Sequence, residues 1–198
     1  MFIEIIHING HYDPEAQQHT PPSGANEVLP QLQYVTERAI ALGGEVLYRM
    51  NLNSNMFEVA SDPTQLEAAI ASDPYLSGLS EESRSKVVVR PDGGLHPPTD
   101  LTDSETRAGM VNWLLENQAV TLAREDELVR RHAQTFVLGA FTMDCVLTTA
   151  KELKRRNGDR MICVDPDLCV DRGGVGFVSG SGQNGAVSIR SIYGIVAD

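Results

Sequence analysis

Short runs of β-branched residues alternate with segments of helical periodicity along this chain. Strands are predicted over residues 2–8, 45–51, 86–90, 135–138, 160–164 and 193–197. Helices are predicted where apolar residues recur every three or four positions, over residues 26–42, 63–71, 103–117, 121–132, 144–156 and 185–192. Strands that alternate with helices favour a parallel sheet that helices cover on both faces through right-handed crossovers.

Turn-forming residues interrupt this pattern at several places. Residues 9–24 are rich in Gly, Asp and Pro, which predicts a long loop without regular structure. Residues 72–86 are predicted to be a surface excursion that follows a short helix with Asp62 as its cap. The sequence PDGG at 91–94 predicts a stop for the third strand, and residues 165–182 form a glycine-rich connection.

Length and charge restrict the class of protein. A chain of 198 residues is long enough for one domain with a sizeable core, so a single domain over 1–198 is predicted. Its 16 Lys and Arg against 27 Asp and Glu give a formal charge of −11, which would repel nucleic acid and anionic membranes. Three cysteines without a Cys-x-x-Cys pair, and the lack of a long apolar run or basic leader, favour a cytoplasmic protein without a membrane segment.

Cys145 occupies a chemically special place in this pattern. It follows the predicted strand at 135–138 and lies in the first turn of the predicted helix that starts at Asp144. Free backbone N–H groups and the positive end of a helix favour a thiolate, and the same groups can hold an oxyanion. The alternative is that Cys145 is a small buried hydrophobic residue, which is the commoner role of cysteine.

The segment LGAFTMDCVLTTAKELKRR resembles the signature Gly-x-x-Thr-x-x-Cys-Val-x-x-Thr-Ala of the isochorismatase-like cysteine hydrolases. The residues in register are Gly139, Thr142, Cys145, Val146, Thr149 and Ala150. An acidic residue usually follows the threonine in that family, whereas here Met143 does. The resemblance implies an α/β fold, a three-layer doubly wound parallel sheet of strand order 3-2-1-4-5-6, with the ligand crevice at the carboxyl ends of the strands.

The resemblance also implies two partners for the cysteine, and both are replaced here. The family has an aspartate at the end of strand one and a lysine at the end of strand three, but this chain has His7 and Arg90. A neutral imidazole can accept the thiol proton and a fixed guanidinium can lower the thiol pKa, so Cys145, His7 and Arg90 are the candidate catalytic residues. Arginine cannot donate a proton, however, and a double replacement is also expected of a scaffold that has lost its activity.

Further site residues follow from the same resemblance. The family carries a cis peptide bond before the cysteine, and the matching bond joins Ala140 and Phe141. The backbone N–H groups of Phe141 and Cys145 are the candidate oxyanion donors. Asn9 stands where the family has a glutamine, and Asn9, Tyr12 and Thr142 are the candidate substrate-pocket residues.

No metal and no cofactor are expected. The nicotinamidases of this family hold a cation through Asp-x-His after strand two, whereas residues 49–55 of this chain contain neither Asp nor His. The main hypothesis is a cysteine-dependent hydrolase of a small amide or related carbonyl compound. The alternatives are a catalytically degenerate small-molecule-binding protein and a structural subunit of an assembly, and the resemblance implies a homo-oligomer, either a dimer or a tetramer.

Overall fold

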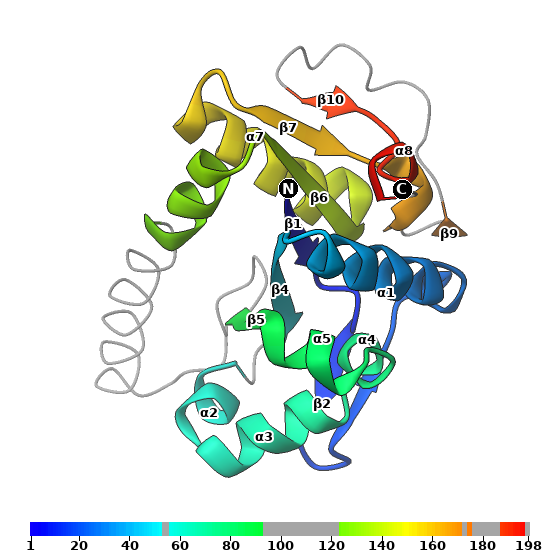
Figure 1. The fold of residues 1–198 in the computed structure, drawn as a ribbon. Coiled ribbons are helices and arrows are strands. Elements are labelled where there is room, and N and C mark those ends of the chain that lie inside the picture. The colour runs from blue at the N-terminus through cyan, green and yellow to red at the C-terminus, as the bar shows by residue number, and fades with distance from the viewer. Residues whose placement is uncertain (53–55, 93–122, 172–173, 176–186, 197–198) are drawn as a thin grey trace.

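The computed structural model describes residues 1–52, 56–92, 123–171, 174–175 and 187–196. Within these residues the protein has an α/β fold, with a mostly parallel central sheet flanked by helices (Figure 1). This coarse fold class agrees with the prediction from the sequence. No helix among the described residues is both long enough and apolar enough to cross a bilayer.

The central sheet is built around β1, which pairs in parallel with β4 on one side and with β6 on the other. Across the described sheet the strands lie in the order β10 (Ser188–Ile189), β7 (Met161–Val164), β6 (Gln134–Ala140), β1 (Phe2–Ile6), β4 (Glu45–Asn51) and β5 (Val87–Asp92). Beyond the end of β7, β8 (Cys169–Asp171) adds to β6 in parallel, and β9 (Gly174–Val175) pairs with β8 in antiparallel orientation.

Helices cover the two faces of this sheet (Figure 1). One face carries α1 (Ala25–Ala41), α4 (Pro74–Ser77) and α8 (Tyr193–Val196). The other face carries α7 (Leu147–Asn157) and a helix that covers residues 123–131. The remaining described helices are α2 (Met56–Ser61), α3 (Pro63–Ala71), α5 (Glu81–Lys86), a π-helical turn η2 (Thr142–Val146) and a 3-10 turn η3 (Pro166–Leu168).

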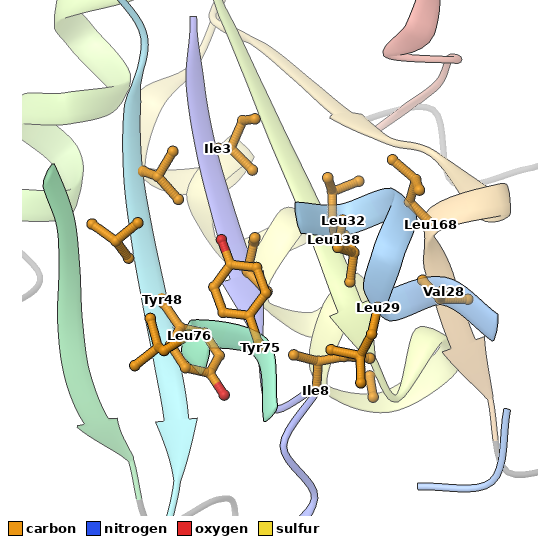
Figure 2. Close-up of a cluster of buried hydrophobic side chains, with 14 of the residues drawn as sticks. Ile3, Ile8, Val28, Leu29, Leu32, Tyr48, Tyr75, Leu76, Leu138 and Leu168 are labelled. Carbon is orange, nitrogen blue, oxygen red and sulfur yellow. The ribbon is translucent and has the colours of Figure 1, made fainter. Parts of the chain in front are cut away.

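Alternation along β1 explains why its sequence is apolar almost throughout. Ile3 and Ile5 pack with Leu32 of α1, whereas Phe2 and Ile6 pack with the α7 layer, and all of these side chains are fully buried. A strand whose two faces are both covered needs apolar residues at odd and even positions alike. Figure 2 shows the first of these clusters, in which Tyr75 and Leu76 of α4 lie beside Tyr48 of β4. Each such buried side chain contributes about 1.5–3 kcal/mol.

The structure corrects two predictions in the first half of the chain. Residues 9–24 contain an antiparallel hairpin of β2 (His11–Asp13) and β3 (Gln18–Thr20), because Asp13 Oδ1 accepts from the N–H groups of the turn and Gln17 adopts a positive φ of 51°. Residues 72–86 contain α4 and α5, and the Asp and Ser residues that suggested a loop are their N-caps. The prediction of α3 with Asp62 as its cap is confirmed.

Four further predictions from the sequence have different outcomes. The predicted helix at 185–192 and strand at 193–197 are wrong, because β10 lies at 188–189 and the helix α8 follows it. Apolar runs of four or five residues carry too little periodicity to separate the two states. The strand at 86–90 does not stop at Pro91 but continues as β5 to Asp92, which an edge strand tolerates. The predicted helix at 103–117 lies outside the described residues.

Candidate functional site

The carboxyl ends of β1 and β6 meet at the edge of the sheet where Cys145 lies. Ile6, the last residue of β1, pairs with Gly139 of β6. Gly139 has a φ of 112°, and a Cβ atom there would lie 2.2 Å from the Ile6 carbonyl oxygen, so only glycine permits this close approach of the two strands. His7 follows Ile6 directly, and its positive φ of 48° turns the chain out of the strand.

Cys145 is held in a π-helical turn in front of α7. A cis peptide bond joins Ala140 and Phe141 at the end of β6, at the position where the family resemblance implies one. The Phe141 carbonyl oxygen then accepts from the N–H groups of Asp144 and Val146, at 3.2 Å and 3.1 Å. Cys145 is partly buried and packs against the apolar cluster under α7.

His7 interacts with both Cys145 and Asp92. His7 is 5% exposed, and its Nε2 atom lies 3.3 Å from Asp92 Oδ2 as an ion-pair contact without hydrogen-bond alignment. Burial lowers the pKa of His7, but interaction with the Asp92 carboxylate and then with the Cys145 sulfur outweighs burial and raises this pKa to about 9. His7 is therefore an imidazolium at neutral pH.

The pKa values of Cys145 and Asp92, the two neighbours of His7, are both lowered. Burial raises the pKa of Cys145, but the His7 imidazolium and a hydrogen bond from the Phe141 N–H bring this pKa below its ordinary value. Burial also raises the pKa of Asp92, and contact with His7 followed by the charges of Arg49 and Arg90 holds it well below its usual range. The interactions within the site therefore favour the thiolate form of Cys145, the imidazolium form of His7 and the carboxylate form of Asp92.

Asp92 is the site residue that sequence reasoning missed. The sequence PDGG predicts that the third strand stops at Pro91, whereas β5 continues to Asp92 and brings its carboxylate next to His7. Asp92 is two residues beyond Arg90 and projects from the same face of the strand. A carboxylate at that spacing was the signal that could have identified it.

Arg90 lies in a different environment from the one that the resemblance implies. Its Nη1 donates to Glu125, a residue of the helix at 123–131 that is 1% exposed. Burial and the charge of Arg49 lower the pKa of Arg90. The structure thus brings Cys145 and His7 together. Arg90 pairs instead with Glu125, and its charge acts on Asp92.

Two of the candidate pocket residues, Asn9 and Tyr12, are buried. The side chain of Asn9 is fully buried, where its Nδ2 donates to His19 Nδ1 and to the Asn51 carbonyl oxygen, and its Oδ1 accepts from the Asn51 N–H. Tyr12 is 1% exposed and packs against the His19 ring with centroids 4.7 Å apart. The structure describes only the backbone of Thr142, as the first residue of the π-helical turn.

The described residues contain no group of three or more His, Cys, Asp and Glu side chains that could hold a metal ion. No protein-family model matches the chain, and no curated protein matches it. The described residues bring together three groups: the Cys145 thiol, the His7 imidazole that interacts with it, and the Asp92 carboxylate that interacts with His7. This is the general form of a site for nucleophilic catalysis.

Asp92→Asn is expected to lower the pKa of His7 by about 1–2 units, because burial then acts against the imidazolium with less opposition. The pKa is measured by NMR titration of the His7 ring, with the resonance assigned from its loss in a His7→Gln variant. Asp62→Asn is the matched control, since Asp62 is an exposed cap of α3 and asparagine also caps helices. An unchanged His7 pKa in Asp92→Asn would show that the carboxylate does not act on the imidazole.

Proposed function

We propose that this protein is a cysteine-dependent hydrolase of a small amide or related carbonyl compound, with Cys145 as nucleophile, His7 as acid and base, and Asp92 as the residue that orients His7. The observation that supports this most strongly is that His7 interacts both with the Cys145 sulfur and with Asp92, whose Oδ2 atom lies 3.3 Å from His7 Nε2. Asp92 here takes the supporting position that the family resemblance gave to Arg90. Arg90 acts on the site through its charge.

The proposed reaction has two halves. The Cys145 thiolate attacks the carbonyl carbon, the oxyanion is held by the Phe141 and Cys145 N–H groups, and the His7 imidazolium gives its proton to the leaving amine. The C–N bond breaks and leaves a thioester on Cys145. The now neutral His7 takes a proton from water, whose oxygen attacks the thioester, and the carboxylic acid departs as the thiolate and imidazolium form again.

Membership of the isochorismatase-like superfamily is part of the same proposal. When the six strands of the main path through the described sheet are numbered among themselves, the order β5-β4-β1-β6-β7-β10 reads 3-2-1-4-5-6. The helices on both faces also support it. The three free cysteines support a cytoplasmic location, and a homo-oligomer remains an expectation from the resemblance.

A catalytically degenerate binding protein is the second candidate. The observation that favours it is the ion pair of Arg90 with Glu125, which keeps a residue at the family lysine position away from direct contact with the nucleophile. In this case the thiol would stay reactive toward small alkylating agents, but no carbonyl compound would be turned over.

Acylation at Cys145 separates the two candidates. We expect p-nitrophenyl acetate to form a thioester on Cys145 that mass spectrometry detects, and a panel of small amides to release amine at a rate that Cys145→Ala abolishes. Cys163→Ala is the matched control, because Cys163 is fully buried in β7 and burial raises its pKa. Alkylation of Cys145 by iodoacetamide without any thioester or amine release would favour the binding protein.

The pH dependence of the same hydrolysis tests the assigned roles. Above about pH 9 the His7 imidazolium is lost, so the rate should fall about tenfold per pH unit as the leaving amine loses its proton donor. On the acid side the rate should fall only below the ordinary pKa of a cysteine thiol, because the folded protein lowers the pKa of Cys145. A rate that keeps rising through pH 9 would contradict the role of His7 as a general acid.

A further inference from the structure

Arg49 lies at the centre of a buried group of charged side chains behind the Cys145 site. Its Nε donates to Glu4 Oε1 over 2.5 Å and its Nη2 donates to Glu125 Oε1 over 2.9 Å. Its Nη1 lies 3.7 Å from Asp92 Oδ2. Glu4, Arg49 and Asp92 share one face of the sheet, because β1, β4 and β5 are in parallel register and these positions have the same parity.

The carboxylate of Asp92 is therefore shared between two cations. Its Oδ2 atom lies 3.3 Å from His7 Nε2 and 3.7 Å from Arg49 Nη1. Arg49 keeps Asp92 ionised, which helps the pair with His7, but its positive charge also offsets part of the negative charge that stabilises the imidazolium. The strength of the Asp92–His7 pair thus depends on how far the charge of Arg49 is itself neutralised.

Glu4 is the closest partner that neutralises Arg49. Its side chain is fully buried, and among the described residues its Oε2 atom has no hydrogen-bond partner. Burial raises the pKa of Glu4 to about 7, against the opposing charge of Arg49. The negative charge opposite Arg49 is therefore easily lost near neutral pH, and a Glu4→Gln variant imitates the protonated form.

We propose that Arg49 and Glu4 form a positioning pair that sets how strongly Asp92 holds the His7 imidazolium beside Cys145. This inference rests on the proposed function, because it assigns the pair a task in the same site. The two members act in opposite directions. The positive charge of Arg49 neutralises part of the charge of Asp92, and the negative charge of Glu4 neutralises Arg49 and so reduces this effect. Neither residue touches the reacting atoms.

The other charged groups around the pair are accounted for. From β5, Arg90 contributes a positive charge toward Asp92, and from the helix at 123–131 Glu125 accepts from both Arg49 and Arg90. From α7, Arg156 donates to the second oxygen of Glu125 at 3.1 Å. Because Glu125 is shared by three arginines, it neutralises Arg49 only in part, which leaves Glu4 as the decisive counter-charge.

The test is the direction in which the pKa of His7 moves in two variants, measured by NMR titration. Glu4→Gln leaves Arg49 less neutralised, so the His7 pKa should fall by about 0.5–1 unit. Arg49→Met removes the competing cation, and buried Glu4 takes up a proton, so the His7 pKa should rise by a similar amount. Arg49→Lys should return it toward the wild-type value. Arg131→Met is the control, since Arg131 is half exposed and pairs with Glu45 and Glu127.

A purely structural role for the pair would lower thermal stability but would not give opposite pKa shifts. Shifts of the same sign in both variants, or shifts no larger than in the Arg131→Met control, would overturn the inference. If Arg49→Met does not fold, the double variant Arg49→Met with Glu4→Gln removes both charges and should have a higher His7 pKa than Glu4→Gln alone. An equal or lower value would also overturn it.

The titration needs no substrate, which separates the two proposals. Opposite shifts without any acylation of Cys145 would leave the positioning pair in place and reject the hydrolase. Acylation of Cys145 with no opposite shifts would do the reverse.

Discussion

In a His7→Gln variant, alkylation of Cys145 by iodoacetamide at pH 7 should slow by about 10- to 100-fold. The wild-type sulfur lies beside an imidazolium that lowers its pKa, and without this cation burial raises the pKa above the ordinary thiol value. At an ordinary pKa of about 8.5 only about 3% of a thiol is ionised at pH 7. Stopped-flow or mass-spectrometric measurement of the rate against pH should show the thiolate forming at higher pH in the variant.

The control for this experiment is His132→Gln. His132 lies two residues before β6 begins, at the amino ends of the strands, where its Nε2 pairs with Glu45 at 2.6 Å. Because it is at the opposite edge of the sheet from Cys145, its loss should leave the alkylation rate unchanged. Equal slowing in the two histidine variants, or none in His7→Gln, would remove His7 from the site.

Cys145 and His7 were accessible to sequence reasoning because both stand at points where the pattern changes. Each follows an apolar strand directly or after a tight turn, and the carboxyl ends of parallel strands share one edge of a sheet. The alternation of elements also gave the α/β class and the parallel sheet. Local signals that agree with tertiary structure in this way can be recognised from a single sequence.

Asp92, Arg49 and Glu4 could not be recognised in the same way. Glu4 and Arg49 each lie among apolar residues of a strand, and only the register of β1 beside β4 shows that they are diagonal neighbours on one face of the sheet. The partner of Arg90 is Glu125, which lies 35 positions later in the chain. Long-range ion pairs leave no periodic trace, so the electrostatics of a site depend on tertiary contacts.

Short segments near the C-terminus and at the β2–β3 hairpin show a second limit of prediction from sequence. At β10 and α8, segments of two and four residues are too short for their sequence pattern to separate a strand from a helix, and pairing with β7 and packing against α1 decide the outcome. The hairpin of β2 and β3 likewise depends on contacts outside it. His19 Nδ1 accepts from Asn9 Nδ2, and His19 Nε2 donates to the Ala69 carbonyl oxygen. In each case tertiary contacts outweighed local preference.

Glu125→Gln should lower the free energy of unfolding by about 3–5 kcal/mol, the range for removing one partner of a buried ion pair. Glu125 is 1% exposed, and its two oxygens accept from Arg49, Arg90 and Arg156, so three cations from β4, β5 and α7 lose their shared counter-charge. Urea unfolding measures the change. Since the charges are buried, added salt should recover little of the loss.

The neighbouring residue supplies a matched comparison for this effect. Asp126 is on the same helix and accepts from Arg156 and Asn157, but its side chain is 19% exposed and water can replace those contacts. Asp126→Asn should therefore cost about 1 kcal/mol. If the two variants are equally stable, the arginines are not held by Glu125, and the charge balance behind Asp92 must be set by other groups. A large decrease in the free energy of unfolding that occurs only in Glu125→Gln would instead show that the helix at 123–131 is held on the sheet by ion pairs with the same arginines whose charges act on Asp92.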